Sequence, residues 1–200
     1  MVPQTRILVT ITALYAVRKR TQALDVIRRA LRSRTTTTRK LSELFIHLSL
    51  FLGYPAMLDG LEQLAGIAGR ARGRSLVKSG QSSSHIRGRQ ILEQIYGRQA
   101  ARLLKRLDAL YPGLGHRITQ DAYGLIMARD GLTMGQREVV NVVALLAHGF
   151  NIQLYSHLRG ALRVGVSRTE LASVVRLASR ITGKSARKAL RALTTIRSSP

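Results

Sequence analysis

GLTMGQREVVNVVALLAHGFNIQLYSHLRGALRVGVSRTELASV, residues 131–174, is the stretch that decides the fold. Its apolar residues recur at steps of three and four, which is the period of a helix with one buried face. They include Val139, Val142, Val143 and Leu146. Ser167 followed by Glu170 is the capping-box pattern of a helix start, and Thr133 followed by Gln136 repeats it. The stretch therefore predicts consecutive helices.

The rest of the chain shows the same periodicity, and no segment has the sustained alternation of a strand. Gly53 and Pro55 predict a turn, because glycine commonly ends a helix and proline commonly starts one. We therefore expect an all-α protein. The expected helices cover residues 5–17, 21–33, 39–52, 55–68, 88–109, 117–129, 135–148, 150–164, 168–182 and 184–197.

One segment interrupts the helical pattern. Residues 69–87 are rich in Gly, Ser and Arg and predict a basic linker. The sequences on either side of it resemble each other, since residues 6–34 can be superimposed on 137–165 with identities spread evenly along the match. This similarity predicts a tandem of two related helical units, over 1–68 and 88–200, joined by the linker.

The composition is that of a folded and strongly basic protein. Hydrophobic residues make up 45% of the 200 residues, and Lys and Arg outnumber Asp and Glu by 33 to 10. The formal net charge of +23 repels itself in the compact state and favours a polyanionic partner, RNA first and an acidic protein or lipid surface next. Aromatic residues make up 4%, too few for a protein that stacks single-stranded bases on aromatic side chains.

The basic residues gather in the first helical hairpin, the linker and the C-terminal helix. Arginine predominates, and its planar fork suits phosphate. Since phosphate contacts carry no base information, we expect recognition of the backbone and shape of a structured RNA. The candidate nucleic-acid-binding residues are Arg18, Lys19, Arg20, Arg28, Arg29, Arg32, Arg34, Arg70, Arg72, Arg74, Arg180, Lys184, Arg187, Lys188 and Arg191.

Thiol and metal chemistry find no support in the sequence. Cysteine is absent, which excludes disulfides and thiolate nucleophiles, and the five histidines show no ligand spacing. We therefore expect neither a metal nor a cofactor. His47 interrupts an apolar run and is expected at the edge of the core, whereas His148, before Gly149, is expected to end a helix. The run itself, residues 44–52, is too short to span a bilayer, so no transmembrane segment is expected.

The opening stretch resembles the carboxymuconolactone decarboxylase family, which also contains the AhpD-type alkylhydroperoxidases. Residues 111–132, YPGLGHRITQDAYGLIMARDGL, resemble the helices that precede it in that family. Residues 41–64, LSELFIHLSLFLGYPAMLDGLEQL, are similar to the family's closing helix pair. The resemblance implies an AhpD-like all-helical fold in tandem form, and an assembly into trimers or hexamers.

The same resemblance implies a polar site. It would comprise Glu138, Gln153 and His157, in which a carboxylate orients an imidazole for acid–base work. In a decarboxylase these groups would protonate the carbanion left by departing CO2. The peroxidase branch uses a CxxC pair, and Phe150 and Gln153 stand at those positions, so peroxidase chemistry is excluded. In the first unit the Glu and His positions hold Ile7 and Val26, which leaves that unit without the site.

Two functions of different classes follow. The charge and the emptied first unit favour a non-catalytic, basic structural subunit of a large assembly, such as an organellar ribosome, that contacts RNA and protein subunits. The alternative is a cofactor-free decarboxylase that uses Glu138 and His157, with the charge serving solubility or steering. Residues 1–40 are basic and poor in acid, which favours a mitochondrial location over a cytoplasmic one.

Overall fold

The computed structural model describes residues 1–69 and 81–196, and every regular element in these ranges is helical. The all-α fold expected from the sequence is therefore confirmed. By its internal contacts the chain forms two units, one of residues 1–73 and 131–200 and one of residues 74–130. We call them unit 1 and unit 2. The first and last segments of the chain thus share one compact unit. The compact units therefore do not divide the chain at the expected boundaries, residues 68 and 88.

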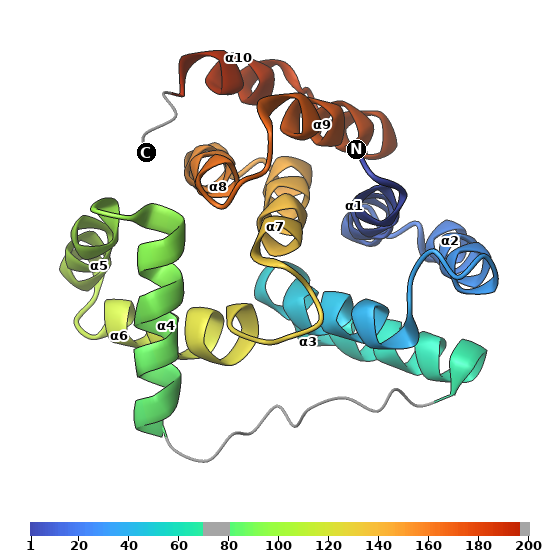
Figure 1. Cartoon of the computed structure of the whole chain (residues 1–200), viewed down its shortest axis with the longest axis horizontal. Coiled ribbons are helices and arrows are strands. Elements are labelled where there is room, and N and C mark those ends of the chain that lie inside the picture. Colours follow the sequence, from blue (N-terminus) through green and yellow to red (C-terminus); the bar gives the residue numbers. More distant parts are fainter. Residues whose placement is uncertain (70–80, 197–200) are drawn as a thin grey trace. The chain divides into compact units, whose positions relative to one another are not determined.

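Unit 1 is a bundle with α1 and α7 at its centre (Figure 1). Each of these helices contributes to two apolar clusters: Val9 and Val143 to one, Leu8 and Val140 to the other. Burying both faces of two adjacent helices fixes their rotation. The helices of unit 1 are α1 (Pro3–Ala16), α2 (Arg20–Arg32), α3 (Thr38–Ala68), α7 (Met134–His148), α8 (Asn151–Arg163), α9 (Arg168–Thr182) and α10 (Arg187–Thr195).

The expected helix starts are present. The Thr133 side chain accepts from the backbone N–H of Gln136, whose side chain accepts from the N–H of Thr133, so α7 begins with a full capping box. Ser167 accepts from the backbone N–H of Glu170 at the start of α9. His148 is the last residue of α7, as expected, and Gly149 follows it in the left-handed conformation.

Helix α3 is broken in the middle. Gly53 has φ 77° and ψ 173°, which no helix accommodates, and Pro55 follows it. A Cβ added to Gly60 would meet the Phe45 ring at 2.1 Å, although residues fifteen apart in a straight helix lie about 22 Å apart. The two halves of α3 therefore fold back on each other, and the turn expected at Gly53 and Pro55 is confirmed.

This break bears on membrane insertion. By length and composition alone, α3 is apolar and long enough to cross a membrane. A span needs about 20 continuous helical residues, and each half of α3 is shorter than that. The hairpin thus supports the sequence expectation of no transmembrane segment, which remains a prediction.

The helices of unit 1 repeat in position along the chain. The offset that superimposes residues 6–34 on 137–165 also carries the starts of α1 and α2 onto the starts of α7 and α8, and it brings the start of α3 to within one residue of the start of α9. Left-handed residues recur at the same offset: Arg18 and Arg34 have φ 60° and 53°, and their counterparts Gly149 and Gly165 have φ 77° and 93°. The turns of the two segments are therefore alike in conformation as well as in position.

Unit 2 contains α4 (Gln81–Tyr96), α5 (Gln99–Leu110), α6 (Leu114–Ile118) and the π-helix η1 (Thr119–Met127). Two sequence expectations were wrong here. Residues 81–87 are helical rather than part of a linker, and Gly97, at φ 55°, divides the expected helix 88–109. The physical reason is close packing of α4 on η1: a Cβ on Gly124 would meet the Ser84 carbonyl oxygen at 2.0 Å, and a Cβ on Gly88 would meet the Thr119 carbonyl oxygen at the same distance. Ser84, one of the small residues that suggested a linker, is therefore buried at this crossing.

Candidate functional site

The candidate site lies in unit 1, where Glu138 on α7 faces His157 on α8. His157 Nδ1 is 2.9 Å from Glu138 Oε2. The Glu138 side chain is fully buried and the His157 side chain is 13% exposed. The pair expected from the sequence is therefore brought together, with the imidazole as its more exposed member.

A second contact holds the carboxylate. Asn141, one turn after Glu138 on α7, donates from Nδ2 to Glu138 Oε1 at 3.0 Å. The same amide nitrogen is 3.2 Å from His157 Nδ1. Both Glu138 oxygens thus have a hydrogen-bonding partner.

The hydrogen bonds continue into the core through α3. His47, which is fully buried, places Nε2 2.6 Å from Asn141 Oδ1. On its other side Arg137 Nη1 is 3.2 Å from His47 Nδ1. Arg137 is also fully buried, and its Nη2 lies 3.7 Å from Oε2 of Glu43. We call His157, Glu138, Asn141, His47, Arg137 and Glu43 the buried polar chain.

His47 is electrically neutral in this setting. Burial, followed by the Arg137 charge, lowers the pKa of His47 from 6.5 to about 3. Phe51 covers the same region, with its ring centroid 6.1 Å from that of His47 and 6.4 Å from that of His157. A neutral His47 can donate from one nitrogen and accept at the other, which lets it join Arg137 to Asn141.

Gln153, the third residue expected at the site, takes no part in the chain. It is exposed on α8, one turn before His157, beside the exposed side chains of Phe150, Ile152 and Tyr155. His157, the partner of Glu138, thus lies on the same two turns of α8 as several exposed apolar side chains.

Metal ligation is not supported by the described residues, among which no three His, Cys, Asp or Glu side chains gather as a metal site would require. The polar chain contains two His and two Glu, but they are separated by Asn141 and Arg137, and the charge of Arg137 disfavours a cation.

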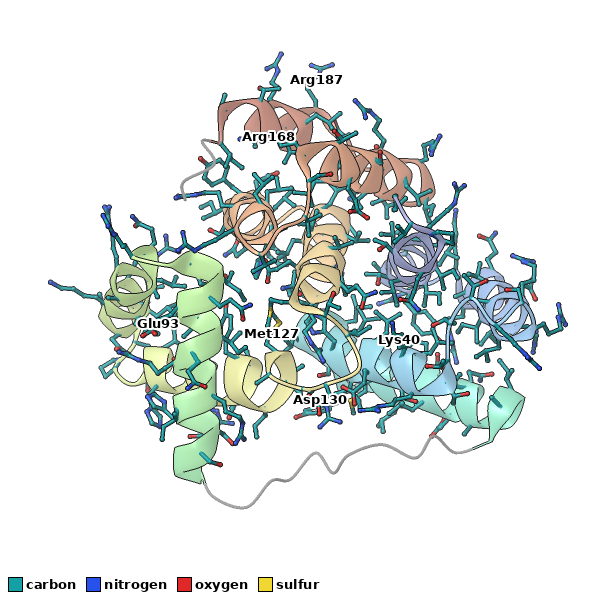
Figure 2. The ribbon with its side chains drawn as sticks, in the orientation of Figure 1. Lys40, Glu93, Met127, Asp130, Arg168 and Arg187 are labelled. Atoms are coloured by element: carbon teal, nitrogen blue, oxygen red, sulfur yellow. The ribbon has the colours of Figure 1, made fainter. Side chains whose placement is uncertain are left out.

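The expected basic residues are exposed wherever the structure describes them. Those of the first hairpin lie on α2 and its turns, and Arg20 pairs with Asp59 while Arg28 pairs with Asp25. Arg187 lies on the outer side of α10 (Figure 2) with Lys188 and Arg191 also exposed. Arg180 and Lys184 precede α10, so the C-terminal stripe runs over two helices and their turn. Arg70, Arg72 and Arg74 lie outside the described residues.

Comparison with known proteins identifies part of the chain. Residues 112–195 match the model of the carboxymuconolactone decarboxylase family. Peroxisomal protein 2 of Saccharomyces cerevisiae is 31% identical over 85 residues, which are 42% of this chain and 30% of that protein. The family resemblance is thereby confirmed for a domain over residues 112–195, and the chain matches less than a third of its curated relative.

The matched domain contains only part of the buried polar chain. The members on α7 and α8 lie inside it, whereas His47 and Glu43 come from α3, outside it. Sequence reasoning missed Asn141, Arg137 and both α3 residues. The available signal was a histidine within the apolar run of α3 and a glutamate directly before that run, but only the folded structure brings them to α7.

Proposed function

We propose that this protein is a cofactor-free acid–base enzyme of the decarboxylase type, with His157 as the catalytic residue that moves the proton. The observation that carries the proposal is the 2.9 Å contact between His157 Nδ1 and a fully buried Glu138. A buried carboxylate that accepts from one imidazole nitrogen fixes the ring and leaves the other nitrogen for proton transfer. This is the arrangement that general acid–base catalysis requires.

The proposed reaction is loss of CO2 from a small organic acid. When the C–C bond to the carboxylate breaks, its electron pair stays on the substrate carbon, and the His157 imidazolium gives that carbon a proton. Nδ1 faces Glu138, so the proton passes from Nε2. Solvent then returns a proton to the imidazole, which its partial exposure permits. Glu138 remains ionised throughout and acts as the positioning residue.

A tandem origin explains why one site is proposed per chain. The helices of unit 1 recur along the chain at a nearly constant offset, which supports an internal duplication. The offset that superimposes residues 6–34 on 137–165 pairs Glu138, Asn141 and His157 with Ile7, Thr10 and Val26. The first segment thus supplies no second acid–base pair, but it supplies His47 and Glu43 to the site of the other.

The test is turnover of a panel of lactone and oxo acids by the parent and by matched variants. Glu138→Gln and His157→Gln should each lower kcat by about 100-fold or more, since general acid–base groups contribute factors of about 10² to 10⁴. His148→Gln, an exposed histidine at the end of α7, should leave kcat unchanged. Equal turnover by parent and both site variants would refute the assignment of the site.

The second candidate is the basic structural subunit that the sequence favoured. It is supported by the net charge of +23 and by the exposed basic residues of α10, in a part of the sequence that has no acidic residue after Glu170. In this proposal an RNA or another polyanion, within a larger assembly or beside further copies of the chain, covers the basic surface. Absence of turnover across the panel would favour it.

Location is likewise a proposal. The basic, acid-poor residues 1–40 favour mitochondrial import, with the cytoplasm as the alternative. The name of the yeast relative adds the peroxisome as a third compartment to test. Imaging of the tagged protein against markers of the three compartments distinguishes them.

A further inference from the structure

We infer that Arg137 sets the direction in which hydrogen bonds are donated along the buried polar chain, and that the chain holds His157 with its proton on Nδ1. The inference rests on the site of the proposed function, but its main readout is the protonation of His157 in the absence of substrate. Arg137, His47 and Asn141 act as positioning residues, because none of them faces the solvent.

The direction of hydrogen-bond donation follows from Arg137, the one member of the buried polar chain that can only donate. A guanidinium has five N–H donors and no acceptor, so Arg137 Nη1 donates to His47 Nδ1 across 3.2 Å. His47 is neutral, because the pKa of its imidazole is lowered to about 3. With Nδ1 accepting, its one proton must be on Nε2. His47 therefore donates to Asn141 Oδ1 across 2.6 Å.

The same order of donor and acceptor continues between the residues of α7. With Asn141 Oδ1 turned toward His47, the Asn141 amide nitrogen faces Glu138 and donates to Oε1 across 3.0 Å. A carboxylate oxygen accepts such a bond. The second Glu138 oxygen, Oε2, lies 2.9 Å from His157 Nδ1 and can only accept. The Asn141 amide nitrogen also lies 3.2 Å from His157 Nδ1, but its hydrogen is directed to Oε1 at the shorter distance of 3.0 Å. His157 Nδ1 therefore carries the proton and donates it to Oε2, which leaves Nε2 as the nitrogen that exchanges a proton with substrate.

The far end of the chain balances the charge. Glu43 Oε2 lies 3.7 Å from Arg137 Nη2, with both side chains buried. A buried guanidinium without a partner carboxylate would be strongly destabilising. Glu43 thus keeps Arg137 in the core, and α3 contributes both the anchor and the relay histidine. An amide at position 141 without this control could rotate by half a turn and present its oxygen to Glu138.

The matched pair of variants at position 47 tests the direction. His47→Gln keeps an acceptor for Arg137 and a donor for Asn141, whereas His47→Leu keeps the bulk and removes both. Long-range ¹H–¹⁵N spectra of histidine-labelled protein report which ring nitrogen carries the proton. With five histidines in the chain, single substitutions assign each signal.

In the parent protein we expect His47 protonated on Nε2 and neutral His157 protonated on Nδ1. In His47→Leu the Asn141 oxygen loses its donor, so the Asn141 amide N–H is free to turn toward His157 Nδ1, 3.2 Å away. Neutral His157 should then gain a measurable fraction of the Nε2–H form, and His47→Gln should retain the Nδ1–H form. If the proposed enzyme activity is present, kcat should fall about 10- to 100-fold in His47→Leu, with KM within twofold, and recover in His47→Gln.

Two results would overturn the inference: His157 protonated on Nε2 in the parent, or an unchanged His157 in His47→Leu. If His47→Leu does not fold, the double variant Glu43→Gln with Arg137→Met removes the donor and its partner together, and an unchanged His157 there would equally overturn it. If the expected tautomers are observed but no acid of the panel is turned over, the proposed function is refuted. The inferred direction of hydrogen-bond donation would still hold.

Discussion

At the scale of single residues, the molecule joins buried charged and polar groups that an apolar core would exclude unless they were paired. Arg137, Glu138 and His47 are all fully buried. Each has a hydrogen-bonding or ionic partner at 2.6 to 3.7 Å. Burying such groups carries a desolvation penalty, which their mutual hydrogen bonds and ionic contacts reduce. A site kept for packing alone would be simpler with apolar residues, as Ile7 and Val26 illustrate in the other segment.

His47 should make stability depend on pH. The pKa of His47 is lowered to about 3 in the folded protein and starts from 6.5 in the unfolded chain. Between these values the unfolded state binds a proton that the folded state does not, so the free energy of unfolding falls as pH falls. The groups that face His47 are Arg137, Asn141 and His157. The slope due to His47 should reach roughly 1.4 kcal/mol per pH unit.

Urea denaturation from pH 7 to pH 4 measures this slope. His47→Gln cannot titrate, so the stability difference between parent and variant should shift in favour of the variant as the pH falls. His148→Gln, at an exposed position, should retain the contribution of His47. Parallel pH profiles of the parent and the His47→Gln variant would show that folding does not lower the pKa of His47.

At the scale of helices, α3 is the element whose interpretation changes most with the structure. Its sequence alone places a turn at Gly53 and Pro55, but composition also permits a single long apolar helix. The close approach of Gly60 to Phe45 shows that α3 folds as a hairpin. The hairpin in turn allows the first half of α3 to lie against α7 and to supply His47 and Glu43.

Two alanine substitutions on the same half of α3 test the hairpin. A Cβ on Gly60 would lie 2.1 Å from the buried Phe45 ring, whereas a Cβ on Gly66 would meet nothing within 4 Å. Gly60→Ala should lower the free energy of unfolding by about 1–3 kcal/mol. Gly66→Ala should raise it by about 0.5–1 kcal/mol, because alanine loses less backbone entropy in a helix. Equal effects in denaturant titrations would indicate a straight helix.

At the scale of the whole molecule, periodicity and caps predicted the helices well because both are local. The starts of α7 and α9 needed only Thr133, Ser167 and the residues three further on. Local patterns could not reveal that α4 crosses η1 through Gly88, or that α3 completes a site on α7. Those contacts join residues far apart in sequence, and a local pattern carries no information about which distant helix a residue meets.

The net charge is a property of the whole chain, and it distinguishes the two proposed functions. If the basic surface binds RNA phosphates, about six contacts would give a log–log dependence of affinity on salt with a slope of roughly −4 to −5. Replacing Arg187, Lys188 and Arg191 with Gln should make the slope less steep by about 2–3. The loss should be equal for unrelated RNA sequences, because phosphate contacts do not read bases.

A second triple variant separates location from total charge. Arg102, Lys105 and Arg106 are exposed on α5, and their replacement with Gln removes the same charge from unit 2. Binding through α10 predicts a large effect of the first variant and a small effect of the second across a salt series. Equal effects of both would indicate unspecific attraction by net charge, and retention curves that match the parent's for both would remove the support for RNA binding. Because the substituted side chains all face solvent, turnover should survive both changes if the protein is an enzyme.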